Sequence, residues 1–254
     1  MDEYTAFAKV YDEFMDNVPY DDWTEYIVSL LKEYDVKDKD LVLDLGCGTG
    51  KITRRLRDCG YDLIGVDSSV EMLDIAIEKE SDRQEKEDGS ILYLNQDMRE
   101  LDLYGTVKAV VSICDCMNYI TDFDDLVTVF KLVNVFLDPK GVFIFDLNTE
   151  YKYTSIGETV IAEDREDKSF IWDNYYDEDE KINSYGLSVF IKADDGRFDK
   201  YSEEHFQRAY SLDEIKTAIK LAGMEFVAAF DAFTRDEVRN DSERIYVICR
   251  ECGK

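Results

Sequence analysis

Short apolar runs alternate with segments of helical periodicity through the first 150 residues of the chain. The runs are rich in Val, Ile and Leu, as expected for strands that are buried on both faces of a parallel sheet. Between them, apolar residues recur every three or four positions, which is typical of helices that cover such a sheet. The pattern therefore predicts an α/β fold, with strands at residues 41–45, 61–67, 91–94, 107–113 and 142–146.

Helix ends carry recognisable signals. Asp122 stands before an apolar-periodic segment as a cap, and Ser211 is followed three residues later by Glu214, which forms a capping box. Gly223 marks the end of the helix that this box begins. The predicted helices are residues 3–16, 21–34, 51–56, 69–79, 122–136 and 211–221.

From Glu150 to Ala209, apolar and polar residues alternate and helical periodicity is weak. Acidic and glycine-containing turns separate the alternating runs. We predict an antiparallel β-meander, inserted after the fifth strand of the core and covering a pocket there. Its strands are expected at residues 159–162, 170–176, 182–192 and 198–210, and two later strands, 225–230 and 245–249, close the core sheet as a hairpin.

The predicted organisation is thus a core with one insertion. Residues 1–149 and 210–254 form the core together with an N-terminal helical lid, and residues 150–209 form the inserted antiparallel subdomain. A chain of 254 residues can bury a substantial core of this kind without disulfides.

The first predicted strand runs into a glycine-rich turn. Glycines stand at positions 46, 48 and 50, and the helical pattern of residues 51–56 follows directly. Glycine permits tight backbone angles and lets main-chain N–H groups approach a ligand closely. This order of elements, a strand, a glycine-rich turn and a helix, is typical of a nucleotide-binding pocket.

The second predicted strand ends at Asp67, seventeen residues after Gly50, which is near the spacing at which a carboxylate contacts a ribose. Two classes of ligand compete for such a pocket, a dinucleotide and S-adenosylmethionine. The dinucleotide pattern Gly-x-Gly-x-x-Gly/Ala requires a small residue at position 51, where this chain has Lys51. The glycine spacing therefore favours S-adenosylmethionine.

The run Asp44-Leu45-Gly46-Cys47-Gly48-Thr49-Gly50 resembles the first motif of class I S-adenosylmethionine-dependent methyltransferases, and Val66-Asp67-Ser68 resembles their second. The resemblance covers residues 41–146 and the closing helix and hairpin. It implies a Rossmann-like, doubly wound sheet of seven strands whose last strand is antiparallel. The inserted sheet is similar to that of glycine and sugar-amine N-methyltransferases. The segments around Tyr11 and Phe145 look like those of uncharacterised small bacterial methyltransferases.

The same resemblance implies S-adenosyl-L-methionine as cofactor and suggests its contacts. Asp97 matches the acid that commonly contacts the adenine amino group, and aromatic residues of the lid can border a sulfonium, because cations are attracted to aromatic faces. The residues expected to bind the cofactor are Tyr11, Tyr20, Trp23, Asp44, Gly46, Cys47, Gly48, Gly50, Asp67, Ser68, Met72, Asp97, Met98 and Cys114.

Residues 114–119 follow the fourth strand, at the edge of the sheet where ligands bind in open α/β folds. We expect them to border the methyl group and a small-molecule acceptor, which is methylated on N or O by in-line displacement. An amine or hydroxyl acceptor must lose a proton, so a base can help. The candidates are Tyr11, Asp115, Tyr119 and His205. An NAD(P)-dependent oxidoreductase and a non-catalytic cofactor-binding protein remain as alternatives.

The composition of the chain argues against several classes of binding partner. The formal charge of −28 opposes binding to nucleic acids, which need Lys and Arg footprints. Cys249 and Cys252 have metal-ligand spacing, but His205 is the only histidine, so we expect no metal site. No run reaches 18 apolar residues and no signal peptide is visible, which predicts a cytoplasmic protein without a membrane span. We expect a monomer or a homodimer.

Overall fold

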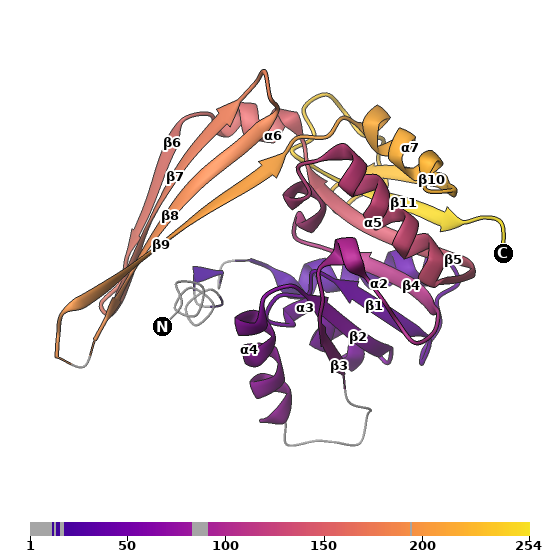
Figure 1. Ribbon diagram of the computed structural model, residues 1–254, viewed down its shortest axis with the longest axis horizontal. Coiled ribbons are helices and arrows are strands. Elements are labelled where there is room, and N and C mark those ends of the chain that lie inside the picture. The colour runs from indigo at the N-terminus through magenta and orange to yellow at the C-terminus, as the bar shows by residue number, and fades with distance from the viewer. Residues whose placement is uncertain (1–11, 13, 16–17, 83–90, 194) are drawn as a thin grey trace.

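The computed structural model describes residues 12, 14, 15, 18–82, 91–193 and 195–254. A seven-stranded sheet lies at its centre (Figure 1). The strands of this sheet are β1 (Leu41–Leu45), β2 (Asp62–Asp67), β3 (Leu92–Asn95), β4 (Val107–Ser112), β5 (Leu137–Asn148), β10 (Met224–Asp231) and β11 (Arg244–Glu251). The helices around it are α2 (Tyr20–Glu33), α3 (Lys51–Asp58), α4 (Val70–Ser81), α5 (Phe123–Phe136) and α7 (Leu212–Leu221), with short 3-10 turns η1 (Met98–Glu100) and η2 (Cys116–Tyr119).

The strand order is β10-β11-β5-β4-β1-β2-β3. Strands β1 to β5 pair in parallel, whereas β11 is antiparallel to both β5 and β10. The order reverses between β1 and β4, because the chain runs outward from β1 to β3 and then returns to the other side of β1. This confirms the predicted doubly wound sheet and places the reversal beside the glycine-rich turn.

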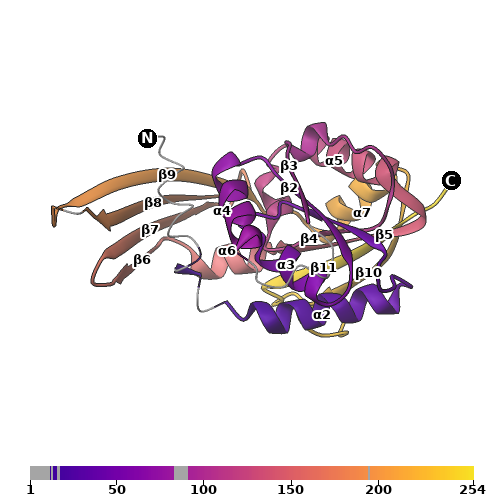
Figure 2. The same cartoon turned by 90° about the horizontal axis from the view of Figure 1, so that it is seen from below.

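Helices cover both faces of this sheet (Figure 2). Successive side chains of a strand point to opposite faces, and β1 shows this directly. Val42 packs in an apolar cluster with Ile27 of α2, whereas Leu43 packs in a second cluster with Phe130 of α5. Burial on both faces explains why every residue of β1 except Asp44 is apolar.

A second, four-stranded sheet extends away from the core in Figure 1. Its strands are antiparallel in the order β6-β7-β8-β9, so the predicted β-meander is confirmed. In β8, every second residue from Asn183 to Val189 is buried, which matches the predicted alternation. The strands are β6 (Thr159–Asp164), β7 (Lys168–Asp177), β8 (Ile182–Lys192) and β9 (Phe198–Arg208).

Among the described residues, helix α6 and the start of strand β5 show the largest differences from the sequence-based expectation. Residues Glu150–Ile156 form helix α6, although weak helical periodicity predicted none there. The helix is short and buries only Tyr153, so no apolar stripe can develop in the sequence. Strand β5 begins at Leu137 rather than 142, because Leu137 already pairs with Val107, and a register shift separates this pair from that of Ala109 with Val142.

The helix predicted at residues 3–16 lies outside the described residues, apart from Asp12, Phe14 and Met15. Among the helices that the structure does describe, none combines the length and the apolarity that a membrane crossing requires. The cytoplasmic location and the monomeric or homodimeric state stay predictions.

Candidate active site

The glycine-rich turn between β1 and α3 has left-handed backbone at all three glycines. The φ angle is +82° at Gly46, +53° at Gly48 and +71° at Gly50, which side chains rarely tolerate. A Cβ atom on Gly46 would also lie 2.7 Å from the Sγ atom of Cys116. Glycine is therefore required both by the bend and by the close approach of the segment after β4.

Asp67, at the end of β2, fastens this turn. Its carboxylate accepts hydrogen bonds from the backbone N–H of Gly48 at 2.8 Å and of Ser69 at 2.9 Å. Burial raises the pKa of Asp67, and these backbone hydrogen bonds oppose the rise because they favour the charged form. Each carboxylate oxygen has further lone pairs. Asp67 can therefore hold the turn in place and still accept hydrogen bonds from the hydroxyl groups of a ligand.

Asp44 lies directly below the turn and is fully buried in the sheet. Its carboxyl group accepts a hydrogen bond of 2.6 Å from Thr53 of α3. Burial, with a smaller contribution from the charge of Asp67, raises the pKa of Asp44 from 3.8 to about 7. Asp44 therefore changes its charge near neutral pH, unlike an ordinary aspartate.

This pKa predicts an unusual dependence of stability on pH. Between pH 3.8 and about 7 the native state keeps a proton on Asp44 that the unfolded chain releases. The contribution of Asp44 to the free energy of unfolding should therefore fall as pH rises, by about 1.4 kcal/mol per pH unit. Urea unfolding of the wild type and of Asp44→Asn at several pH values measures it. A difference between the two proteins that stays constant with pH would contradict this assignment.

A cavity of about 800 Å³ lies between the glycine-rich turn and the second sheet. This volume is within the range of small-molecule sites. Most residues that the sequence analysis selected line the cavity: Tyr20, Asp44, Gly46, Cys47, Gly48, Asp67, Ser68, Met72, Asp97, Met98, Cys114, Asp115, Tyr119 and His205.

Two of the selected residues, Gly50 and Trp23, are described by the structure and do not line this cavity. Tyr11 lies outside the described residues. Gly50 caps α3 behind the turn. Trp23 packs against Phe233, with ring centroids 5.4 Å apart, and its ring lies 5.3 Å from the guanidinium of Arg244. The side chain of Trp23 therefore supports Arg244, because α2 turns this residue toward β11 instead of the cavity.

Arg244 links two carboxylates beneath the cavity. It forms ion pairs with Asp115, at 2.7 Å, and with the fully buried Asp146 at the end of β5. The backbone N–H of Asp115 also donates to Asp146 at 2.9 Å. Cys114 and Asp115 both have left-handed backbone, with φ angles of +69° and +53°. The ion pairs and the hydrogen bond hold this uncommon conformation in place.

The environment of Asp115 bears on its candidacy as a base. Burial alone would raise its pKa, but the charge of Arg244 and hydrogen bonds from Arg244 and Gln207 outweigh burial and lower the pKa of Asp115. A carboxylate with a lowered pKa is a weak proton acceptor. Asp115 is thus better suited to orienting groups around it than to taking a proton.

The inner face of the second sheet carries an aromatic stack. The rings of Trp172 and Tyr185 lie 4.3 Å apart, and those of Tyr185 and His205 lie 4.8 Å apart. The hydroxyl of Tyr119 contacts that of Tyr185, which joins the stack to the segment after β4. His205 also lies 3.0 Å from the carboxylate of Glu203, two residues earlier on β9.

Several lining residues were missed by the sequence analysis. Glu203 and Gln207 each lie two residues from His205 on β9, so all three side chains point to the same face of the sheet. The alternation of the sequence could therefore have identified them. Arg244 and Lys152 also line the cavity, and no local pattern marks them. Arg244 is 129 residues from Asp115 in sequence, and only the folded topology brings them together.

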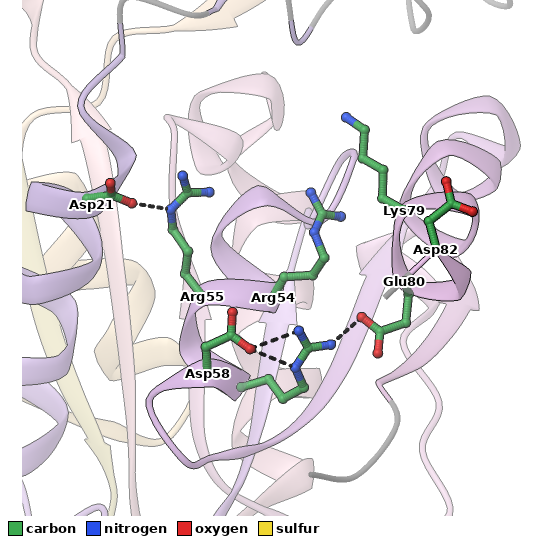
Figure 3. A pocket seen from close by; sticks show the side chains of 8 residues that line it. Asp21, Arg54, Arg55, Asp58, Lys79, Glu80 and Asp82 are labelled. Atoms are coloured by element: carbon green, nitrogen blue, oxygen red, sulfur yellow. Dashed lines mark hydrogen bonds and ion pairs between the residues drawn. The ribbon is translucent and has the colours of Figure 1, made fainter. Parts of the chain in front are cut away.

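A second hollow, of about 520 Å³, lies between α3 and α4 (Figure 3). Its basic residues are largely matched by acids. Arg55 pairs with Asp21 at 2.7 Å, and Arg57 pairs with both Asp58 and Glu80. The pair of Arg55 and Asp21 is exposed, as is common on a solvated surface, whereas Arg57 is buried beside its two acids. These cations already have partners, so the candidate site is the larger cavity.

Cys249 and Cys252 have metal-ligand spacing in the sequence. Cys249 is buried within β11, and Cys252 is exposed just after it. Within the described ranges there is no group of three or more His, Cys, Asp or Glu residues that could hold a metal ion.

Comparisons with known proteins agree with this geometry. Residues 42–141 match the family model described as a methyltransferase domain. YqeM of Bacillus subtilis (strain 168), which is named as a methyltransferase, is 36% identical over 96% of this chain and 95% of its own length.

Two solved structures are also similar. An S-adenosylmethionine-dependent methyltransferase from Clostridium acetobutylicum ATCC 824 superposes with a TM-score of 0.85 at 29% identity, covering 98% of this chain and 99% of that one. The fold is shared with S-adenosylmethionine-bound CalS10, an amino pentose methyltransferase from Micromonospora echinaspora, with a TM-score of 0.73 at 15% identity over 96% and 97% of the two chains. These matches favour the methyltransferase over the dinucleotide-binding alternative. The chain belongs to the S-adenosylmethionine-dependent methyltransferases.

Proposed function

We propose that this protein transfers a methyl group from S-adenosylmethionine to an amine nitrogen of a small molecule bound against the inner face of the second sheet. The residues present suit the cofactor. The carboxylate of Asp67 can accept hydrogen bonds from ribose hydroxyls, and Asp97 and Met98 can border the adenine, because all three line the cavity together with the glycine-rich turn. This turn lets a ligand approach the backbone closely.

The bound cofactor supplies a methyl carbon that its sulfonium has already activated. The task of the protein is therefore to align an acceptor with that carbon and to exclude water, and alignment alone can be worth an effective molarity of about 10⁵–10⁸ M. The aromatic stack of Trp172, Tyr185 and His205 gives the acceptor a wall opposite the glycine-rich turn.

One observation carries the choice of an amine. Glu203 is buried and lines the cavity, and its Oε1 atom has no hydrogen-bond partner among the described residues. A buried carboxylate oxygen without a donor is costly. An ammonium or amine N–H of the acceptor would satisfy it.

A nitrogen must be unprotonated to form a bond to carbon. In this proposal the amine binds as an ammonium at Glu203 and gives one proton to the Glu203–His205 pair. Its free electron pair then forms the N–C bond while the S–C bond electrons stay on sulfur. His205 lies 3.0 Å from Glu203, so it can share the proton with that carboxylate.

The likeness to an amino pentose methyltransferase is consistent with a nitrogen acceptor but shows the fold alone. A hydroxyl acceptor is the second candidate, because a histidine paired with a carboxylate can also serve as base for an O–H group.

The test uses S-adenosylmethionine with a deuterated methyl group and a small-molecule extract of bacterial cells. Mass spectrometry of the labelled product should place the label on nitrogen. Glu203→Gln should lower kcat/KM about tenfold or more, because a charged hydrogen bond is lost, with S-adenosylmethionine affinity unchanged.

Glu204→Gln is the matched control, because Glu204 is the next residue of β9 and lies exposed on the opposite face. A label on oxygen would favour the second candidate. Equal activity of the two variants would remove Glu203 from the site.

A further inference from the structure

Lys152 is a cationic residue of the cavity that the reaction proposed above does not use. It belongs to the first turn of α6 and lines the cavity together with Tyr153. Its backbone N–H donates to the hydroxyl of Thr149 at 3.3 Å, and that hydroxyl donates to the carbonyl oxygen of Ser242 at 2.6 Å. These contacts fix the start of α6, and with it the position of Lys152.

The ammonium group of Lys152 has no hydrogen bond or ion pair within the part of the chain that the structure describes. Three carboxylates act on Lys152 from beyond contact distance: those of Asp115 and Asp146, which are ion-paired with Arg244, and that of Glu243. An unpaired cation facing a cavity is notable in a chain with 58 acidic and 30 basic residues.

Lys152 is also partly withdrawn from water. Burial lowers its pKa, and the charge of Arg244 lowers it further. A half-buried cation without a contacting anion loses hydration that no protein group replaces. A negatively charged ligand group would supply the missing acceptor.

Resting on the amine methylation proposed above, we propose that the acceptor also carries an anionic group, a carboxylate or a phosphate, which binds to Lys152. Glu203 and Lys152 then receive opposite charges of one dipolar acceptor. Together they discriminate against simple amines, which would leave Lys152 unpaired, and against simple acids, which would leave Glu203 unpaired.

The experiment divides the small-molecule extract on a strong anion exchanger at alkaline pH, where amino groups are neutral and anionic groups are retained. The retained and unretained fractions are each incubated with the wild-type protein and deuterium-labelled S-adenosylmethionine. We expect the labelled product to arise from the retained fraction. Label from the unretained fraction at an equal rate would overturn the inference.

Variants test the residue itself. With the retained fraction, Lys152→Met should lower kcat/KM about tenfold or more, and Lys152→Arg should recover most of the loss because it keeps the charge. A role as base would instead leave Lys152→Arg as inactive as Lys152→Met, because arginine stays protonated. Lys181→Met is the control, since Lys181 pairs with Glu150 of the same helix on the exposed surface. Equal activity of Lys152→Met and Lys181→Met would contradict the proposal.

Calorimetry separates the remaining outcomes. The carboxylate of S-adenosylmethionine is another possible anion, and weaker cofactor binding by Lys152→Met would assign Lys152 to the cofactor and overturn the inference. If the protein binds S-adenosylmethionine but neither fraction gives a labelled product, the proposed amine methylation is contradicted. The proposed anion site at Lys152, which rests on it, is then contradicted as well.

Discussion

Replacing Arg244 with methionine is expected to destabilise the protein by about 3–5 kcal/mol. Arg244 is the direct ion-pair partner of both Asp115 and the completely buried Asp146. Removing the cation leaves two carboxylates without a contacting charge in a poorly hydrated place, and this cost exceeds the lost attraction. For a chain of this size the melting temperature should fall by roughly 10 °C.

Two further variants make this result specific. Arg244→Met combined with Asp146→Asn should recover part of the loss, because one uncompensated charge is removed and the hydrogen bond from the Asp115 N–H can remain. Arg239→Met should cost less than about 1 kcal/mol, because Arg239 forms its ion pairs on the exposed surface. Thermal and urea unfolding measure all three proteins. Similar losses for Arg244→Met and Arg239→Met would show that the buried ion pairs contribute little.

Asp67→Ala is expected to weaken S-adenosylmethionine binding about tenfold to a hundredfold, while the protein stays folded. The carboxylate of Asp67 has two tasks in the structure. It anchors the N–H groups of Gly48 and Ser69, and it faces the cavity where ribose hydroxyls can bind. Losing it should therefore loosen the turn and remove the hydroxyl acceptors together.

Titration calorimetry measures the affinity, and circular dichroism confirms folding. Asp62→Ala is the control, because Asp62 is an exposed acid at the opposite end of the same strand, β2. Unchanged affinity of Asp67→Ala would remove Asp67 from the cofactor site. An equal loss in both variants would point to a general effect on the strand.

The sequence predicted the parts of this protein that depend on local patterns. Continuous apolar runs indicated the core strands, alternation indicated the second sheet, and the glycine spacing indicated the turn beside Asp67. Helix α6 was missed because seven residues with one buried side chain produce no periodic signal.

Other features depend on contacts between distant segments. The arginine at position 244 reads as an ordinary charge at the start of a strand until β11 pairs with β5 and brings it to Asp146. The sequence predicts Trp23 near the cofactor because aromatic residues beside a sulfonium are chemically plausible. It gives no sign of the contact between Trp23 and Phe233, which lies about two hundred residues further along the chain.

The second sheet is built from one uninterrupted piece of chain, and it contributes Trp172, Tyr185, Glu203 and His205 to the cavity. The glycine-rich turn and Asp67 come from separate elements of the core. Under the proposed function, substitutions on the inner faces of β7, β8 and β9 should change which acceptor is methylated and leave S-adenosylmethionine binding in place.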